Sequence, residues 1–231
     1  MTRPTRQLVV LVALAMLLLL PGCLAAPRPD GPAAGRDEGP AQLERVEVRE
    51  YEGLDLSSID DFRENSIAGP QQVERDSYRL SISGFVETPE SLSYEEVLAG
   101  RSYRKVVTLD CVEGWSVDIL WEGVLLRDLI QNAGPRPPAN TVVFRAQDGY
   151  STSLPLDYLL DNEILLAYSM NGVELPAERG FPFQLVAEDK WGYKWIKWVT
   201  EIELTDDPTY RGYWENRGYS NSGDRDRSSR E

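Results

Sequence analysis

One cysteine stands where metal chemistry could take place. Cys111 follows a strand-like run at residues 105–109 and precedes Glu113-Gly114, which is typical of a turn. A thiol at such a junction points at a site built from loops, whereas a thiol within a strand packs in the core. A thiolate is a soft ligand, and a single thiolate can hold a metal whose other ligands come from a cofactor. The alternative interpretation is a buried and inert cysteine.

Four cations between residues 179 and 197 could bind an anion. They are Arg179, Lys190, Lys194 and Lys197. Gly180 and Gly192 would let the backbone approach a ligand, and arginine with lysine is the usual chemistry for a phosphate. In an extended strand, Lys194 and Lys197 would point to opposite faces, so sharing one anion with Arg179 requires a bend near Trp195. The alternative is a solvated basic strand with aromatic core positions between the cations.

The composition excludes several classes of function. The chain has no histidine, which excludes histidine-ligated zinc or haem and any Ser-His or Cys-His hydrolase. Its formal net charge of −14 argues against nucleic-acid binding and against electrostatic adhesion to anionic lipid. The two cysteines are Cys23 and Cys111. If Cys23 is lipidated, Cys111 has no second thiol for a disulfide or for thiol exchange.

The first 50 residues predict export and a lipid anchor. Arg3 and Arg6 precede an apolar run at residues 8–20, which has the length of a secretory signal rather than a membrane span. Gly22-Cys23 then resembles a bacterial lipobox, in which Cys23 becomes the lipidated first residue; the alternative is an ordinary signal with an incidental cysteine. We therefore predict a lipoprotein-type signal peptide at 1–22 and a flexible tether at 23–50. The protein would lie at the periplasmic or extracytoplasmic face of the cell membrane.

Apolar periodicity and turn signals predict a single α+β domain at residues 51–219. Its predicted strands lie at residues 78–86, 105–109, 141–146, 164–168, 183–187 and 196–204. Its predicted short helices lie at residues 93–100, 124–133 and 155–160, and its clearest turns are Asp148-Gly149 and Asn171-Gly172. The polar residues 220–231 are predicted to be a disordered tail.

Seven motifs follow one another along the domain. They are TLDC at 108–111, WEGVLL at 121–126, DGY at 148–150, AYSMNGVELP at 167–176, RGFP at 179–182, GYKWIKWV at 192–199 and YWENRGY at 213–219. Taken in this order, they resemble the molybdopterin-binding domain of the sulfite oxidase family, including its bacterial periplasmic methionine-sulfoxide reductases. The resemblance implies a sulfite oxidase-type fold of mostly antiparallel and mixed sheets with short helices. Neither the haem domain nor the dimerisation domain of that family is evident, which favours a monomer.

The resemblance also implies a molybdenum–molybdopterin cofactor and assigns residues to it. Cys111 matches the cysteine that ligates molybdenum beside the pterin dithiolene. Tyr219 matches an active-site tyrosine. The residues that match positions holding the pterin and its phosphate are Asn65, Asn171, Arg179, Lys194 and Lys197.

Several positions depart from the family pattern in ways that bear on the substrate. Arg179 replaces the usual histidine before Gly-Phe-Pro, and Gln184 replaces a frequent arginine. Glu64 and Glu113 stand where sulfite oxidases place arginines that hold a dianion, and Arg63 could replace only one of these. A neutral or cationic substrate, such as a sulfoxide or other S- or N-oxide, is therefore expected in place of sulfite.

The function implied is oxygen-atom or two-electron transfer on a small-molecule substrate, with the cofactor doing the chemistry. Since no haem motif is present, electrons would pass to or from a separate redox partner, such as a membrane cytochrome or a quinol-linked subunit. The alternative hypothesis is a cofactor-free surface binding protein descended from the same fold.

Overall fold

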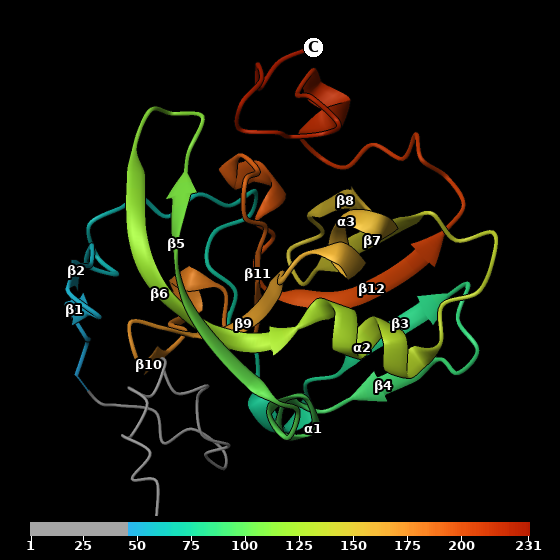
Figure 1. The fold of residues 1–231 in the computed structure, drawn as a ribbon, viewed down its shortest axis with the longest axis horizontal. Coiled ribbons are helices and arrows are strands. Elements are labelled where there is room, and N and C mark those ends of the chain that lie inside the picture. The colour runs from blue at the N-terminus through green and yellow to red at the C-terminus, as the bar shows by residue number, and fades with distance from the viewer. Residues whose placement is uncertain (1–45) are drawn as a thin grey trace, which may run out of the picture. The chain divides into compact units, whose positions relative to one another are not determined.

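The strand that ends beside Cys111 is one arm of a long antiparallel hairpin. β5 (Ser102–Asp110) pairs with β6 (Ser116–Leu125) in continuous register, from Ser102 opposite Val124 to Asp110 opposite Ser116. The hairpin stands at one side of the computed structural model, which describes residues 46–231 (Figure 1). The predicted signal peptide at 1–22 and the predicted lipidation site Cys23 lie outside the described residues.

The hairpin belongs to an antiparallel five-stranded sheet. Its strand order is β10 (Val173–Glu174), β9 (Leu165–Met170), β6 and β5, and β11 (Gln184–Val186) also pairs with β9. All six residues of β9 are buried, because β9 lies inside the sheet with both faces covered. The β6–β9 register shifts at Gly123, where a Cβ atom would lie 2.3 Å from Leu166 O, so only glycine fits this close approach.

A second five-stranded sheet is mixed. Its strand order is β4 (Glu90–Leu92), β3 (Leu80–Gly84), β12 (Val199–Thr205), β7 (Thr141–Ala146) and β8 (Ser151–Pro155). β12 runs parallel to β3, and the other neighbours are antiparallel. The buried face of β12 carries Val199, Ile202 and Leu204 into the common core.

The helices are short and cover the sheets. α1 (Tyr94–Leu98) begins with a capping box between Ser93 and Glu96. α2 (Leu126–Ala133) ends at the left-handed Gly134, and α3 (Leu156–Asp161) follows β8. A two-stranded ribbon, β1 (Glu50–Tyr51) with β2 (Leu54–Asp55), precedes both sheets. These elements confirm the predicted α+β class with mixed and antiparallel sheets. None of the helices within residues 46–231 is long and apolar enough to cross a membrane.

One predicted strand begins later than expected. The sequence predicted a strand from residue 196, but Gly192–Lys194 form a 3-10 turn and β12 begins at Val199. Trp198 has a φ of +55°, which turns the chain sharply just before the strand. The bend that the cation spacing required near Trp195 is therefore present.

Residues 220–231 are not the disordered tail that the sequence predicted. The N–H of Trp191 donates to Gly223 O at 2.8 Å, and the N–H of Arg225 donates to Asp189 O at 2.9 Å. Arg225 also forms an ion pair at 2.7 Å with Asp110, the last residue of β5. Polar composition predicted disorder, but these polar groups have partners that are distant in sequence.

The close packing of residues 220–231 predicts that one added methyl group, at Gly223, lowers the stability of the protein. Gly223 has a φ of +65°, and a Cβ atom there would lie 2.6 Å from Lys194 Cγ. Because the Lys194 side chain is fully buried, it cannot move aside, and Gly223→Ala should lower the free energy of unfolding by about 1–3 kcal/mol. Gly218→Ala is the matched control, with a φ of +86° but nothing within 4 Å of its Cβ. Equal losses in chemical denaturation of the two variants would refute the packing argument.

Candidate active site

Cys111 is the first residue of the loop that joins β5 to β6. Its N–H donates to Trp115 O at 2.9 Å, and the N–H of Gly114 donates to Cys111 O at 3.0 Å. Gly114 adopts a φ of +88°, which closes the loop tightly and favours glycine. The predicted arrangement of a strand, then the thiol, then a turn is confirmed, and the cysteine is buried at the strand end.

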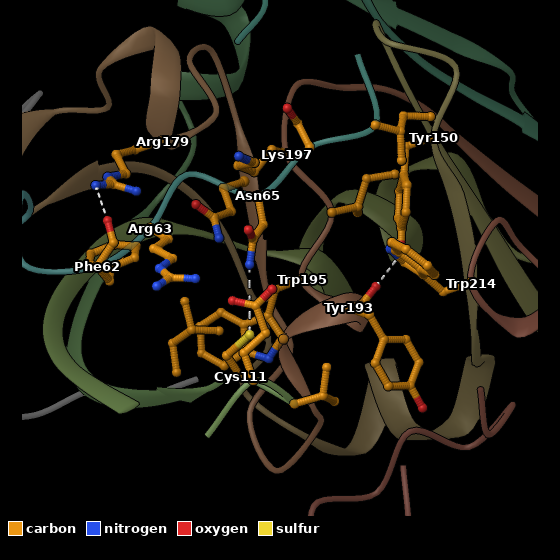
Figure 2. Close-up of a pocket in the computed structure, with 18 of the residues that line it drawn as sticks. Phe62, Arg63, Asn65, Cys111, Tyr150, Arg179, Tyr193, Trp195, Lys197 and Trp214 are labelled. Atoms are coloured by element: carbon orange, nitrogen blue, oxygen red, sulfur yellow. Dashed lines mark hydrogen bonds between the residues drawn. The ribbon is translucent and has the colours of Figure 1, made fainter. Parts of the chain in front are cut away.

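Opposing effects act on the Cys111 thiol. Burial raises its pKa, and the Glu113 carboxylate raises it further, whereas hydrogen bonds from the backbone of Glu113 and Val112 and from Asn65 lower it. Asn65 Nδ2 lies 3.8 Å from the Cys111 Sγ and points at the sulfur (Figure 2). The net effect is a raised pKa, so the protein's own groups do not favour the thiolate. A bound metal ion deprotonates a coordinating thiol outright, and the donors around the sulfur would then stabilise its anion.

The sulfur faces a cavity of about 260 Å³ lined by parts of residues 62–67, the β5–β6 loop and residues 192–198. Gly192 packs against the base of that loop, where a Cβ atom would lie 3.3 Å from Asp110 O and 3.6 Å from Cys111 Cα. Gln184 is a buried residue that also lines the cavity, and its side-chain amide makes no hydrogen bond to residues 46–231. A ligand in the cavity could therefore contact the Cys111 sulfur, the backbone at Gly192 and the unpaired amide of Gln184.

Two of the predicted phosphate-binding cations line this cavity, but both already have contacts. Arg179 donates to Ile59 O and Phe62 O, each at 2.8 Å, and is directed at Phe62 in Figure 2. Lys197 Nζ lies 2.5 Å from a carboxylate oxygen of Glu64. Burial lowers the pKa of Lys197, and the Glu64 carboxylate opposes that shift. An incoming anion would therefore compete with Glu64 for Lys197.

The third predicted cation, Lys194, is directed elsewhere, which corrects the expected convergence of three cations on one anion. Its Nζ is fully buried, 2.6 Å from Glu215 Oε1 and 3.0 Å from Ser153 O. Burial lowers its pKa, and Glu215 opposes that shift. The 3-10 turn at Gly192–Lys194 rotates Lys194 away from Lys197, into the core beneath the C-terminal segment. The bend thus separates the two lysines.

Asn171 is also outside the cavity lining, although the sequence predicted that it binds the cofactor. Its Oδ1 accepts from Leu120 N at 3.0 Å, and its Nδ2 donates to Glu47 Oε1 and to Ser57 O, each at 2.8 Å. Asn171 has a φ of +46° in the turn after β9. These contacts use its side chain to attach residues 47–57 to the sheet.

An aromatic cluster forms the far wall of the cavity. Tyr219, the predicted active-site tyrosine, lines the cavity with its ring 5.1 Å from that of Tyr193 and 5.3 Å from that of Trp214. The Tyr219 hydroxyl accepts from Arg230 at 3.3 Å, so its own proton remains available. Tyr150 completes the wall, and its hydroxyl donates to Tyr193 O at 2.5 Å (Figure 2).

Several residues that line the cavity were not singled out from the sequence. Among them are the aromatic residues Phe62, Tyr150, Tyr193 and Trp214. Tyr150, Tyr193 and Trp214 lie inside motifs that carried the family resemblance, so the signal was present but could not be separated from core aromatic positions. Phe62 is packed against Trp115, with ring centroids 5.5 Å apart, a contact between segments that are distant in sequence.

Comparison with known proteins identifies the class to which this fold and site belong. The family described as the oxidoreductase molybdopterin binding domain matches residues 67–214, more than half of the chain. The chain therefore belongs to that family, and it is a molybdopterin-dependent oxidoreductase with a molybdenum–molybdopterin cofactor.

Individual relatives fall within the same group. An uncharacterized oxidoreductase, YuiH of Bacillus subtilis, is 36% identical over 156 residues, covering 67% of this chain and 78% of its own. The protein-methionine-sulfoxide reductase catalytic subunit MsrP of Xanthomonas campestris is 30% identical, covering 88% of this chain and 70% of its own. The structure of the sulfane dehydrogenase SoxCD from Paracoccus pantotrophus matches with a TM-score of 0.58 and 25% identity, over 60% of this chain and 41% of that chain.

Proposed function

We propose that the protein transfers oxygen atoms or electron pairs between a small-molecule substrate and a separate redox partner. The observation that carries this proposal is the Cys111 sulfur, which faces a cavity and has the Asn65 amide 3.8 Å away. A soft anionic ligand with open space beside it suits a metal whose other ligands come from a cofactor. The molybdenum cofactor supplies the two-electron chemistry, and the protein supplies binding, orientation and electrostatics.

The cavity residues have four roles in this proposal. Cys111 would ligate the metal, and Asn65 would orient the sulfur. Arg179 and Lys197 would hold the anionic part of the cofactor, and Arg63 lines the same cavity without an ion pair within residues 46–231. Tyr219 would donate a hydrogen bond from its hydroxyl to the oxygen that is transferred.

The charges of the cavity support a neutral or cationic substrate. Its lining carries three cations, Arg63, Arg179 and Lys197, and three carboxylates, Glu113, Asp148 and Glu178. Glu64 further neutralises Lys197. A dianion such as sulfite would thus meet no net positive charge, although it must lose water to enter. A sulfoxide or other S- or N-oxide carries no net charge and avoids this cost.

Steady-state assays of the loaded enzyme test this proposal. We expect a kcat/KM for sulfoxide reduction above about 10⁴ M⁻¹s⁻¹ and a value for sulfite oxidation well below it. Glu113→Arg should raise the sulfite value by adding positive charge at the exposed rim, whereas Glu113→Gln, the control, should change it less. Sulfite turnover by the wild type at about 10⁴ M⁻¹s⁻¹ or more would show that the charge argument is wrong.

Attachment and partnership form the remaining part of the proposal. Cys23 would carry the lipid that holds an exported protein at the membrane, and mass spectrometry of the native protein would detect the acyl chains.

MsrP is named a catalytic subunit, and a relative in Azospira oryzae is named a putative protein-methionine-sulfoxide reductase subunit, which supports a separate partner for electrons. A native preparation that folds but lacks molybdenum and pterin would instead favour the cofactor-free binding protein.

A further inference from the structure

The C-terminal part of the chain presents two arginines stacked on tyrosines beside the cavity. The Arg217 guanidinium carbon lies 3.6 Å from the centre of the Tyr213 ring, and that of Arg230 lies 4.2 Å from the centre of the Tyr219 ring. Trp214 joins the two tyrosines, with its ring centroid 5.3 Å from each of theirs. We call Tyr213, Arg217, Tyr219 and Arg230 the arginine–tyrosine face.

Both arginines of this face lack an ion-pair partner in the described part of the chain, on a protein that is acidic overall. The chain carries a net charge of −14, yet neither Arg217 nor Arg230 forms an ion pair within residues 46–231. Neighbouring Arg211, by contrast, is 2.7 Å from Glu231. Both arginine side chains of the face are exposed, and stacking holds each planar guanidinium in place while leaving some of its N–H donors free. Such groups are well suited to bind carboxylates of another molecule.

We propose that the arginine–tyrosine face binds an acidic surface patch on the protein that exchanges electrons with this enzyme. The proposal rests on the proposed function, in which the redox partner is a separate protein. Tyr219 both belongs to the face and lines the cavity of Cys111. A protein bound there would lie directly beside the active site, where electron transfer requires it to be.

Screening favours a protein partner over an anionic membrane surface. The screening length is about 8 Å at physiological ionic strength, so a small acidic patch bound at the face interacts mainly with Arg217 and Arg230. An extended anionic bilayer would also be repelled by the rest of the chain, whose net charge is −14. The same two arginines therefore attract a compact acidic protein more strongly than a membrane.

A small acidic flavodoxin serves as the probe of this face. Reduction of the loaded enzyme by the flavodoxin should be at least about 10-fold slower for Arg217→Glu at low salt, and the difference should shrink as salt is raised. Reduction by a neutral dye should be unchanged. Arg101→Glu is the matched control, because Arg101 is also exposed, unpaired within the described residues and stacked on a tyrosine, 4.8 Å from the Tyr103 ring. Arg101 precedes β5 and Cys111 follows it, so the two residues lie roughly 30 Å apart along the strand.

Each outcome separates the surface from the chemistry. Equal effects of Arg217→Glu and Arg101→Glu on the flavodoxin rate, or no effect of either, would overturn the proposal. A third outcome would also overturn it. If the Arg217→Glu protein no longer sedimented with phosphatidylglycerol vesicles but kept the wild-type rate of reduction by flavodoxin, the face would bind lipid and not a protein. Flavodoxin binding measured by interferometry needs no turnover, and therefore tests the face even if the enzyme fails every substrate assay.

Discussion

Replacement of Cys111 by serine should give a folded protein that has lost its turnover. The side chain is small and lies at the cavity edge, so the substitution removes a sulfur ligand without opening a hole in the core. Loss of a residue that only supports a metal ligand typically costs about 10–100-fold in metal affinity or activity. Loss of the ligand itself should therefore reduce kcat by more than about 100-fold.

X-ray absorption and thermal unfolding together test this prediction. The loaded Cys111→Ser variant should show one fewer sulfur bound to molybdenum than the wild type, while its thermal unfolding stays close to that of the wild type. Asn65→Ala is the companion variant, because it removes the amide 3.8 Å from Sγ and leaves the ligand in place. It should keep the sulfur count and lose less activity. An unchanged sulfur count in Cys111→Ser would end the assignment of Cys111 as the ligand.

Lys194→Met should destabilise the protein more than any other single change considered. It would leave the Glu215 carboxylate fully buried with Thr152 Oγ1 as its remaining donor at 2.6 Å, and Glu215 Oε2 already has no hydrogen-bond partner among the described residues. Removing one member of a buried ion pair costs about 3–5 kcal/mol, because the other charge stays desolvated and unpaired. We expect a loss of that size in the free energy of unfolding.

The double variant Lys194→Met with Glu215→Leu provides the control for that loss. Replacing both charges with apolar groups removes the uncompensated carboxylate, so much of the lost stability should return. Lys197→Met provides the contrast, since Lys197 lines the cavity and should affect cofactor retention more than folding. If Lys194→Met instead released the pterin at unchanged stability, Lys194 would bind the phosphate as the sequence first indicated.

The sequence by itself located the thiol that we propose as the metal ligand and most of the framework around it. Alternation and turn residues are local signals, and they placed the end of β5, the Gly114 turn and the helices α1 to α3 close to their observed positions. The family motifs supplied the cofactor class, which the family match confirms. The absence of histidine excluded histidine-ligated metals and histidine-dependent hydrolases, and Cys111 is the one cysteine outside the predicted lipid anchor.

Only the tertiary structure decided which polar residues serve the cavity and which serve the fold. Lys194 and Lys197 look equivalent in the sequence, but one meets Glu215 in the core and the other meets Glu64 at the cavity. Asn171 donates a hydrogen bond to Glu47, which is 124 residues away in the sequence, and Arg225 donates one to Asp110, which is 115 residues away. A charged or amide side chain takes its role from the partner that satisfies it, and here those partners come from distant segments. Local sequence patterns cannot predict which distant residues will pair in the folded protein.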